Sequence, residues 1–263
     1  MDIKHYLFNS FIIQSGDKKI AIDPGAALYF FNFKTLLPKS EWKDVDYIFV
    51  THGDPDHHWY TDKVAETSNA SVICNKTMVR EKEGNQLMIG PRDRGLTFST
   101  LIKKLYTLSV DETIQLDEMV ITGIQTTHGP LVFKFGPFSK TVHPGSEERL
   151  GLGSMGFKIE LDGKVIVNLG DTVLNENDWK KIKNPDVLML PIGGSIPRNT
   201  MDEEEALKAV KIMEPKFVIP THYNCPALFS KNYNPSDDGM FKEKVEEMGF
   251  NCMILNYGDS VTI

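Results

Sequence analysis

Apolar and β-branched residues occur in short runs along the chain, and turn-forming residues separate these runs. Runs of this kind predict strands that bury one or both faces. Two neighbouring pairs are joined by Asp117-Glu118 and Asp162-Gly163, and the second is a strong hairpin signal. The predicted strands are Ser10–Gln14, Lys19–Ile22, Tyr47–Thr51, Val72–Cys74, Glu112–Leu116, Met119–Gln125, Phe157–Leu161, Lys164–Leu169, Val187–Pro191, Phe217–Pro220 and Cys252–Asn256.

Helical patterns lie between the later strands. The segment Met201–Met213 follows Thr200, and Glu203 stands three positions after that threonine, which is the spacing of an N-terminal capping box. The other predicted helices are Trp59–Thr67, Thr97–Lys104 and Asp237–Met248. Strands outnumber helices, and the last helices alternate with strands. This order is typical of a layered α/β domain rather than a helical bundle or a β-sandwich.

Two stretches interrupt the pattern. Residues 80–105 mix charged residues with glycines, and residues 129–153 are rich in glycine and proline. Loops of this length inside a compact domain often act as lids, although a simple surface excursion explains them equally well. A chain of 263 residues can build one large α/β domain. We therefore predict a single domain over residues 1–263 with loop insertions near 80–105 and 129–153.

Composition excludes several classes of protein. Apolar residues make up 41% of the chain and charged residues 25%, which is close to the average of soluble globular proteins. No apolar run is long enough to span a membrane, and the first residues, MDIKHYLFNSF, lack the apolar centre of a signal peptide. The three cysteines, Cys74, Cys225 and Cys252, cannot all pair. We expect a cytoplasmic protein without membrane association.

The charge balance bears on partners. The chain has 29 basic and 36 acidic side chains, a formal net charge of −7. Nucleic-acid binding usually needs a basic face, so no nucleic-acid partner is expected.

Candidate metal ligands crowd into the segment THGDPDHH, residues 51–58, which directly follows an apolar run. His52 and Asp54 lie two positions apart, so on an extended chain they face the same way and can share one ion. Pro55 forces a turn, after which Asp56 and His57 point toward a second ion. Imidazole and carboxylate ligands suit zinc, manganese or iron. The alternative is a polar turn with incidental histidines, and this density of ligands disfavours it.

Three more candidate ligands stand at or just beyond the ends of apolar strands. They are His128 in TTHG, Asp171 in NLGDT and His222 in PTHYN. In α/β proteins, sites are built where strand ends meet at one edge of a sheet. Each residue alone would suit a structural turn, but together with residues 51–58 they predict one metal centre.

With Asp23 in IAIDPG, these motifs stand in the order found in one family. The chain resembles the metallo-β-lactamase-fold superfamily of metal-dependent hydrolases along essentially its whole length. The runs GFKIELDGKVIVNLGDT and PIGGSIPRNTMDEEEALKAVKIMEPKFVIPTHYN are most similar to the ascorbate-6-phosphate lactonase-like branch. The resemblance implies a four-layer αβ/βα sandwich with metal ions at one edge, between the sheets.

The resemblance also implies roles for individual residues. The first of two divalent ions would be held by His52, Asp54 and His128. The second would be held by Asp56, His57 and His222. Asp171 would bridge both ions, and Asp23 would orient a ligand from behind. Zinc is the first expectation for both ions.

Asp54 departs from the family pattern, which commonly has histidine at this position. A carboxylate is a harder ligand, so it shifts the preference toward manganese or iron. The flavodiiron branch also has a carboxylate there, which makes a di-iron redox protein the first alternative. Against it, the chain has no recognisable flavin motif and no room for an attached flavin domain. A metal-binding sensor without catalysis is a further alternative.

The predicted reaction is hydrolysis. A metal-bound hydroxide would cleave an ester, lactone or phosphodiester bond of a small, anionic metabolite, with Asp56 and Asp171 as the catalytic carboxylates. Candidate substrate contacts are His143, Arg149 and Asn224. Each has a plainer explanation, as an exposed loop histidine, a solvated arginine and a residue that holds a loop. Members of the lactonase-like branch often form homo-oligomers, so self-association is a further expectation.

Overall fold

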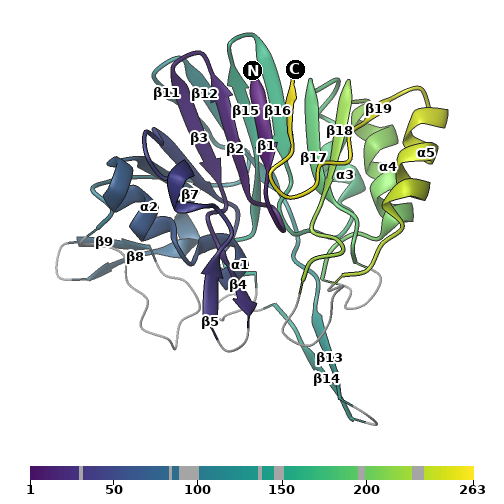
Figure 1. Cartoon of the computed structure of the whole chain (residues 1–263), viewed down its shortest axis with the longest axis horizontal. Helices are drawn as coiled ribbons and strands as arrows, with labels where there is room; N and C mark the ends of the chain where they lie inside the picture. The colour runs from purple at the N-terminus through teal and green to yellow at the C-terminus, as the bar shows by residue number, and fades with distance from the viewer. Residues whose placement is uncertain are drawn as a thin grey trace.

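The computed structural model describes residues 1–29, 32–82, 85–88, 101–135, 138–144, 151–194, 199–226 and 234–263. Its first large sheet has seven strands, in the order β10-β7-β6-β3-β2-β1-β20 (Figure 1). These strands are β1 (Asp2–His5), β2 (Phe11–Ser15), β3 (Lys18–Ile22), β6 (Tyr47–Val50), β7 (Ser71–Asn75), β10 (Lys104–Leu108) and β20 (Ser260–Thr262).

The second large sheet also has seven strands, in the order β11-β12-β15-β16-β17-β18-β19. They are β11 (Thr113–Leu116), β12 (Met119–Gln125), β15 (Met155–Leu161), β16 (Lys164–Asn168), β17 (Val187–Pro191), β18 (Phe217–Thr221) and β19 (Asn251–Cys252). The α-helices are α1 (Pro55–His58), α2 (Thr61–Ser68), α3 (Glu176–Trp179), α4 (Glu203–Met213) and α5 (Asp238–Glu247).

Alternate residues of the central strands belong to different layers of the core. In β6, Tyr47 and Phe49 face the second sheet, whereas Ile48 and Val50 pack in the cluster that contains residues of α2. The strand is therefore apolar along its whole length, as expected for a sheet covered on both faces. Between the sheets, the rings of Phe49 and Phe157 meet edge to face at 5.1 Å.

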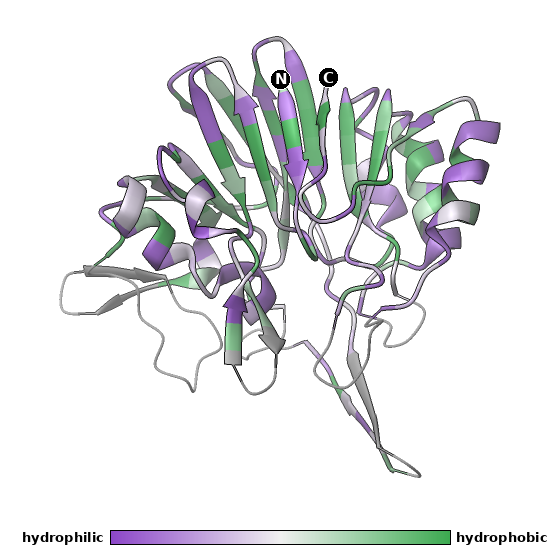
Figure 2. Ribbon diagram, in the orientation of Figure 1, coloured by the Kyte–Doolittle hydropathy of each residue, from purple (hydrophilic) through white to green (hydrophobic). Residues whose placement is uncertain are grey.

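The second sheet follows the same rule. Val187 and Met189 of β17 join the core between the sheets. Leu188 and Leu190 pack with residues of α4 and α5 on the outer face. Figure 2 shows hydrophobic positions along both sheets and polar positions on the outward sides of these helices. The layers are therefore helix, sheet, sheet and helix, which confirms the predicted αβ/βα sandwich.

Strand direction brings the ends of several strands to one edge. In the first sheet, β3 pairs in parallel with β6, and β6 with β7. In the second, β16, β17 and β18 are parallel, and β12 runs in the same direction because β15 is antiparallel to both β12 and β16. Helix α1 and the segments that follow these strands lie on the lower side of the sandwich in Figure 1.

Three smaller hairpins accompany the sheets. They are formed by β4 (Ala26–Tyr29) with β5 (Asn32–Thr35), β8 (Val79–Lys82) with β9 (Asn85–Met88), and β13 (Leu131–Phe135) with β14 (Phe138–Val142). The last two occupy parts of the stretches near 80–105 and 129–153, where no strands were predicted. Residues 89–100 and 145–150 of those stretches lie outside the described residues. None of the described helices is long and apolar enough to cross a membrane.

The two predicted hairpins are confirmed: Asp117-Glu118 joins β11 to β12, and Asp162-Gly163 joins β15 to β16. Other predictions were wrong in detail. Helix α4 begins at Glu203 rather than Met201, because the Asp202 side chain accepts a 3.0 Å hydrogen bond from the Glu205 amide and takes the capping role assigned to Thr200. The last predicted strand ends at Cys252.

Half of the helix predicted over Thr97–Lys104, residues 97–100, lies outside the described residues. Its described end is not helical, because Lys104 begins β10. This strand pairs in parallel with β7, and hydrogen bonding to that sheet edge overrides the local helical pattern.

Candidate metal centre

Candidate ligands lie in the segments that follow strands of both sheets, at the edge where these strands end. His52 follows β6 in the first sheet, whereas His128, Asp171 and His222 follow β12, β16 and β18 in the second. All four side chains are buried. The two sheets thus bring candidate ligands together from opposite sides.

Helix α1 carries the rest of the set. Asp54 precedes the helix in an extended conformation, and its side chain makes no capping hydrogen bond. One carboxylate oxygen instead accepts the Gly151 amide at 2.9 Å, which leaves Oδ2 facing the centre. The helix can approach the segment between β3 and β4 closely because residue 25 is glycine: a Cβ atom there would lie 1.9 Å from the Asp56 carbonyl oxygen.

The first ligand group consists of His52, Asp54 and His128. Their ligand atoms lie within 4.8 Å of one another. Asp54 Oδ2 is 3.5 Å from His52 Nε2 and 3.4 Å from His128 Nε2. These are the three residues that the resemblance assigned to the first ion.

The second ligand group consists of Asp56, His57 and His222, again within 4.8 Å. Asp56 Oδ2 is 3.5 Å from His57 Nε2 and 3.3 Å from His222 Nε2.

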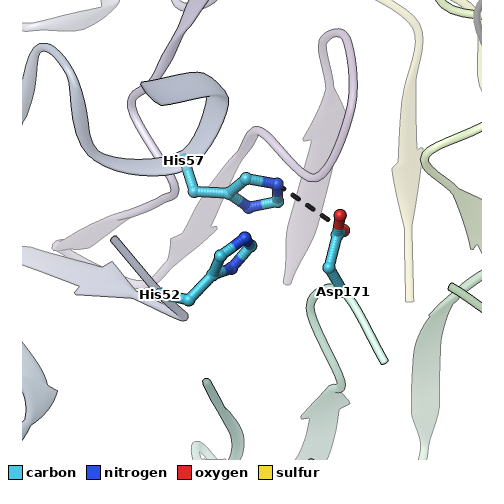
Figure 3. A group of neighbouring side chains, drawn as sticks. All are labelled: His52, His57 and Asp171. Carbon is cyan, nitrogen blue, oxygen red and sulfur yellow. Dashed lines mark ion pairs between the residues drawn. The ribbon is translucent and has the colours of Figure 1, made fainter. Parts of the chain in front are cut away.

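Asp171 faces both groups. Its carboxylate is 3.5 Å from His57 Nε2, 3.0 Å from His222 Nε2 and 3.8 Å from His128 Nε2. Figure 3 shows the carboxylate pointing toward the His57 ring, with the His52 ring beside it. A residue in this position is placed to touch ions held by either group.

The spacing of these atoms fits a divalent cation. Two ligand atoms that share a tetrahedral zinc ion lie about 3.4 Å apart, given metal–ligand distances of roughly 2.1 Å. The Asp54 distances of 3.4 and 3.5 Å match this value. His52 Nε2, His57 Nε2 and Asp171 Oδ1 are buried and have no hydrogen-bond partner among the described residues. Buried polar atoms without partners are rare, and a cation in each ligand group would satisfy all three.

Each histidine is fixed through its other ring nitrogen. His57 Nδ1 donates to Asp23 Oδ2 at 2.7 Å, and His128 Nδ1 to the Gly129 carbonyl at 2.7 Å. His52 Nδ1 lies 3.1 Å from the Thr51 hydroxyl, which donates to Asp23. Protonation at Nδ1 leaves Nε2 free as the ligand atom, which is the usual arrangement in metal sites.

The Asn234 amide holds the fourth ring. Its Nδ2 position lies 2.6 Å from His222 Nδ1, and its Oδ1 has no other partner. Amide oxygen and nitrogen exchange places by rotation about χ2, so Oδ1 can accept the Nδ1 proton there. In that orientation His222 Nε2 also faces the centre unprotonated.

Two residues of the centre adopt backbone conformations that favour glycine. The φ angles are +44° at Asp23 and +52° at His222. Left-handed conformations cost free energy in other residues and cluster at functional sites. Here they turn both side chains back toward the space between the sheets.

Burial and mutual repulsion perturb the carboxylates. Burial raises the pKa of Asp171 to about 6 and also raises that of Asp54. Burial opposes ionisation of Asp56 as well, but the charges of His57 and His222 outweigh it and hold its pKa well below the usual range.

The histidines differ in the same way. Burial lowers the pKa of His128 to about 4 and lowers that of His52 well below its ordinary value. Burial also acts on His57, yet Asp171, Asp56 and Asp23 together raise its pKa well above normal. A proton held among carboxylates in the metal-free protein marks a place where a cation is favoured, and metal binding releases such protons.

The predicted substrate contacts have different outcomes. His143 is exposed and follows β14, and Arg149 lies outside the described residues. The Asn224 amide donates to the Ser236 carbonyl at 2.9 Å and accepts the Ser236 amide at 3.1 Å. These bonds account for Asn224 as a residue that holds a loop, and its contact with substrate stays a prediction.

Apart from Asp23, sequence reasoning missed the residues that support the candidate ligands from behind. Asn9 and Asn168 are fully buried and hydrogen-bonded to each other, and Asn9 also donates to Asp23. Asn168 is the first residue of the NLGDT motif, but only Asp171 in that motif was singled out, and no motif marks Asn9. Three of the seven histidines lie outside the ligand groups. Of these, His5 bonds the Leu255 carbonyl and His58 the Asp54 carbonyl.

Comparisons with known proteins agree with this geometry. The profile described as the β-lactamase superfamily domain matches residues 2–222. A UPF0173 metal-dependent hydrolase of Pelotomaculum thermopropionicum is 32% identical over 261 residues, which cover 96% of each chain. The structure of Igni18, a metallo hydrolase of Ignicoccus hospitalis, covers 100% of this chain and 99% of its own, with 21% identity and a TM-score of 0.71.

A third likeness concerns fold alone. CmlA of Streptomyces venezuelae, a diiron β-hydroxylase, is 10% identical with a TM-score of 0.68, and the match covers 100% of this chain and 54% of CmlA. The assignment to the lactonase-like branch stays a prediction. The profile match and the relatives are decisive for the family: the chain belongs to the β-lactamase superfamily and is a metal-dependent hydrolase.

Proposed function

We propose that the enzyme uses two divalent ions, one in each ligand group, to hydrolyse an ester, lactone or phosphodiester bond of a small anionic metabolite. The observation that carries this proposal is the placement of Asp171. Its carboxylate lies within 3.8 Å of histidines from both groups. A single carboxylate shared in this way suits two neighbouring ions better than one.

When bound, two such ions polarise the scissile group and lower the pKa of the attacking water. The residues of the chain divide the remaining work. The Asp56 side chain is 26% exposed, whereas that of Asp171 is 2% exposed. Asp56 is therefore the carboxylate that can reach both the centre and solvent, and we assign it as the acceptor of the water proton. Asp171 keeps the two groups together.

Zinc is the first candidate for both ions because imidazole predominates among the ligands. Manganese or iron is the alternative for the first group, where Asp54 adds a hard carboxylate. Two divalent ions would also offset the negative charge of the three ligand carboxylates. The centre can therefore attract an anion although the net charge of the chain is −7.

The test combines metal analysis with activity. The chain is purified without added metal, loaded separately with zinc and manganese, and assayed on esters, lactones and phosphodiesters. We expect two ions per chain and activity on at least one substrate class. Fewer than one ion per chain, not recovered on adding either metal, would contradict the proposal. A phenylalanine variant of Tyr257, which is 53% exposed, serves as a matched control that leaves the ligands unchanged.

A di-iron redox protein is the second candidate, and Asp54 is the observation that favours it. A carboxylate in the first group is suited to iron. Absorption and electron paramagnetic resonance spectra of protein grown with iron distinguish the two. Full hydrolytic activity with manganese, in a protein whose iron form shows no redox change, would exclude this candidate. Action in the cytoplasm and assembly into a homo-oligomer stay predictions.

A further inference from the structure

The turn between β1 and β2, residues Leu7–Ser10, lies behind the metal centre. The Ser10 amide donates to the Leu7 carbonyl at 3.1 Å and closes the turn. Asn9 within it is polar yet 0% exposed. A buried amide of this kind is retained only when its hydrogen bonds are satisfied, so its partners are informative.

The Asn9 amide is bonded at both ends. Its Nδ2 donates to Asp23 Oδ2 at 2.7 Å and to Asn168 Oδ1 at 2.9 Å. Its Oδ1 accepts Asn168 Nδ2 at 2.9 Å. Asn9 lies in the turn between two strands of the first sheet, and Asn168 is the last residue of β16 in the second. The two amides therefore form a closed pair across the sandwich.

Each end of this pair leads to a ligand. Asp23 Oδ2 accepts the Nδ1 proton of His57 at 2.7 Å. Asn168 Oδ1 accepts the amide of Gly170, the residue before Asp171, at 3.0 Å. Asn9 thus connects the supports of His57 and Asp171, two side chains from different sheets whose facing atoms are 3.5 Å apart.

The same turn also contacts a third ligand. The Phe8 carbonyl accepts the backbone amide of His222 at 3.2 Å. The Phe8 and His222 rings meet edge to face, with centroids 5.2 Å apart. One turn therefore supports His57, Asp171 and His222, the residues around the second position.

We infer that Asn9 is a positioning residue for the second ligand group. Asp23 Oδ2 accepts bonds from Asn9, the Thr51 hydroxyl and His57. The Asn9 donor fixes the rotation of this carboxylate, so that it presents an acceptor to His57 Nδ1. Through its bonds to Asn168, Asn9 also fixes the distance between the segment that carries His57 and the segment that carries Asp171. The inference rests on the metal ligands of the proposed function.

The test is an Asn9→Ala variant, with zinc binding and the His57 imidazole as readouts. We expect the zinc affinity of the second group to fall by about 10-fold, the lower end of what loss of such a supporting contact costs. We also expect the low-field Nδ1–H proton resonance of His57 in the metal-free protein to shift or broaden. Competition with a chelator measures the affinity, and proton NMR measures the resonance.

The matched control is Asp186→Ala. Asp186 is buried at the opposite end of β17, where it accepts the Val165 amide at 2.8 Å and pairs with Lys216 at 2.7 Å. We expect it to lower stability while leaving zinc affinity and the His57 resonance unchanged. If Asn9→Ala does not fold, Asn9→Ser, which keeps a polar group, replaces it.

The outcomes separate the two proposals. A wild-type chain that binds neither zinc nor manganese contradicts the proposed function, and a chain that binds only manganese is compared with its variants by manganese affinity instead. A wild-type chain that binds zinc, with folded Asn9 variants of equal affinity and an unshifted His57 resonance, contradicts the positioning role alone. Equal losses in the Asn9 and Asp186 variants also contradict it, because they would reflect general destabilisation.

Discussion

The two ligand groups are similar in composition but differ in what supports them. In the second group, His57 donates to the Asp23 carboxylate, which is itself held by Thr51 and Asn9. In the first group, His128 donates to the carbonyl of its neighbour Gly129. Hydrogen bonds to a charged acceptor are roughly twice as strong as neutral ones. His57 is therefore more firmly positioned than His128, whereas His52 reaches the same carboxylate through Thr51 and His222 is held by the neutral Asn234 amide.

The carboxylates show the same difference. The facing histidines lower the pKa of Asp56, whereas burial raises that of Asp54. Asp54 is held by the Gly151 amide, from the segment that precedes β15. The ligand atoms of each group already lie within 4.8 Å of one another, so the difference lies in the charges around them: two histidines face the carboxylate of Asp56, whereas burial opposes ionisation of Asp54. We expect the second group to bind its ion more tightly.

The largest expected effect comes from the residue that the two groups share. Asp171→Ala should leave less than one ion per chain and lower hydrolytic activity by at least about 10³-fold, because both positions lose a ligand. Elemental analysis and an activity assay check this. Retention of two ions by the variant would contradict this, because it would show that each group binds its ion without Asp171.

A selective effect should follow from the support behind His57. Asp23→Asn should weaken the second group by about 10- to 100-fold, as loss of a charged supporting partner does in other metal sites. The first group should change much less, since His52 reaches Asp23 only through Thr51. Stepwise zinc titration separates the two affinities. Equal weakening of both steps would contradict the difference in support.

Metal preference should respond to the carboxylate of the first group. Asp54→His replaces a hard oxygen ligand with imidazole, so the ratio of zinc to manganese affinity should rise by roughly 10-fold at that position. Competition binding with the two metals measures this ratio. An unchanged ratio would mean that Asp54 is not a ligand.

The smallest expected effect concerns pH and the metal-free protein. The folded-state pKa of Asp171 is raised to about 6 from 3.8. Its contribution to stability is therefore fully present below pH 3.8 and is lost as the pH rises through about 6. Asp171→Asn removes this ionisable group. The difference in the free energy of unfolding between the metal-free variant and the metal-free wild type should therefore be more favourable to the variant at pH 7.5 than at pH 5, by about 1 kcal/mol. Urea unfolding at both pH values checks this, and a pH-independent difference would contradict it.

The ligand positions could be predicted from the sequence because each one follows a readable apolar run. His52, His128 and His222 come directly after buried strands, and parallel strand ends meet at one edge. The assignment of each residue to a group required the family resemblance. Adjacent residues such as Asp56 and His57 both turn toward the second position, which spacing alone does not specify.

The supporting residues could not be predicted in the same way. Asn9 and Asn168 are 159 positions apart, and only the stacking of the two sheets brings them together. The β13–β14 hairpin was not predicted because glycines and prolines flank and interrupt its apolar residues, which favoured the interpretation as a loop. The cap at Asp202 was missed because Thr200 offered an equally good local signal.

We propose that two ions share Asp171, and diffraction from zinc-loaded crystals, recorded on both sides of the zinc absorption edge, tests this proposal. We expect two anomalous peaks, one coordinated by His52, Asp54 and His128 and the other by Asp56, His57 and His222, with Asp171 bound to both. A single peak at full zinc loading, or two peaks of which Asp171 touches only one, would contradict it.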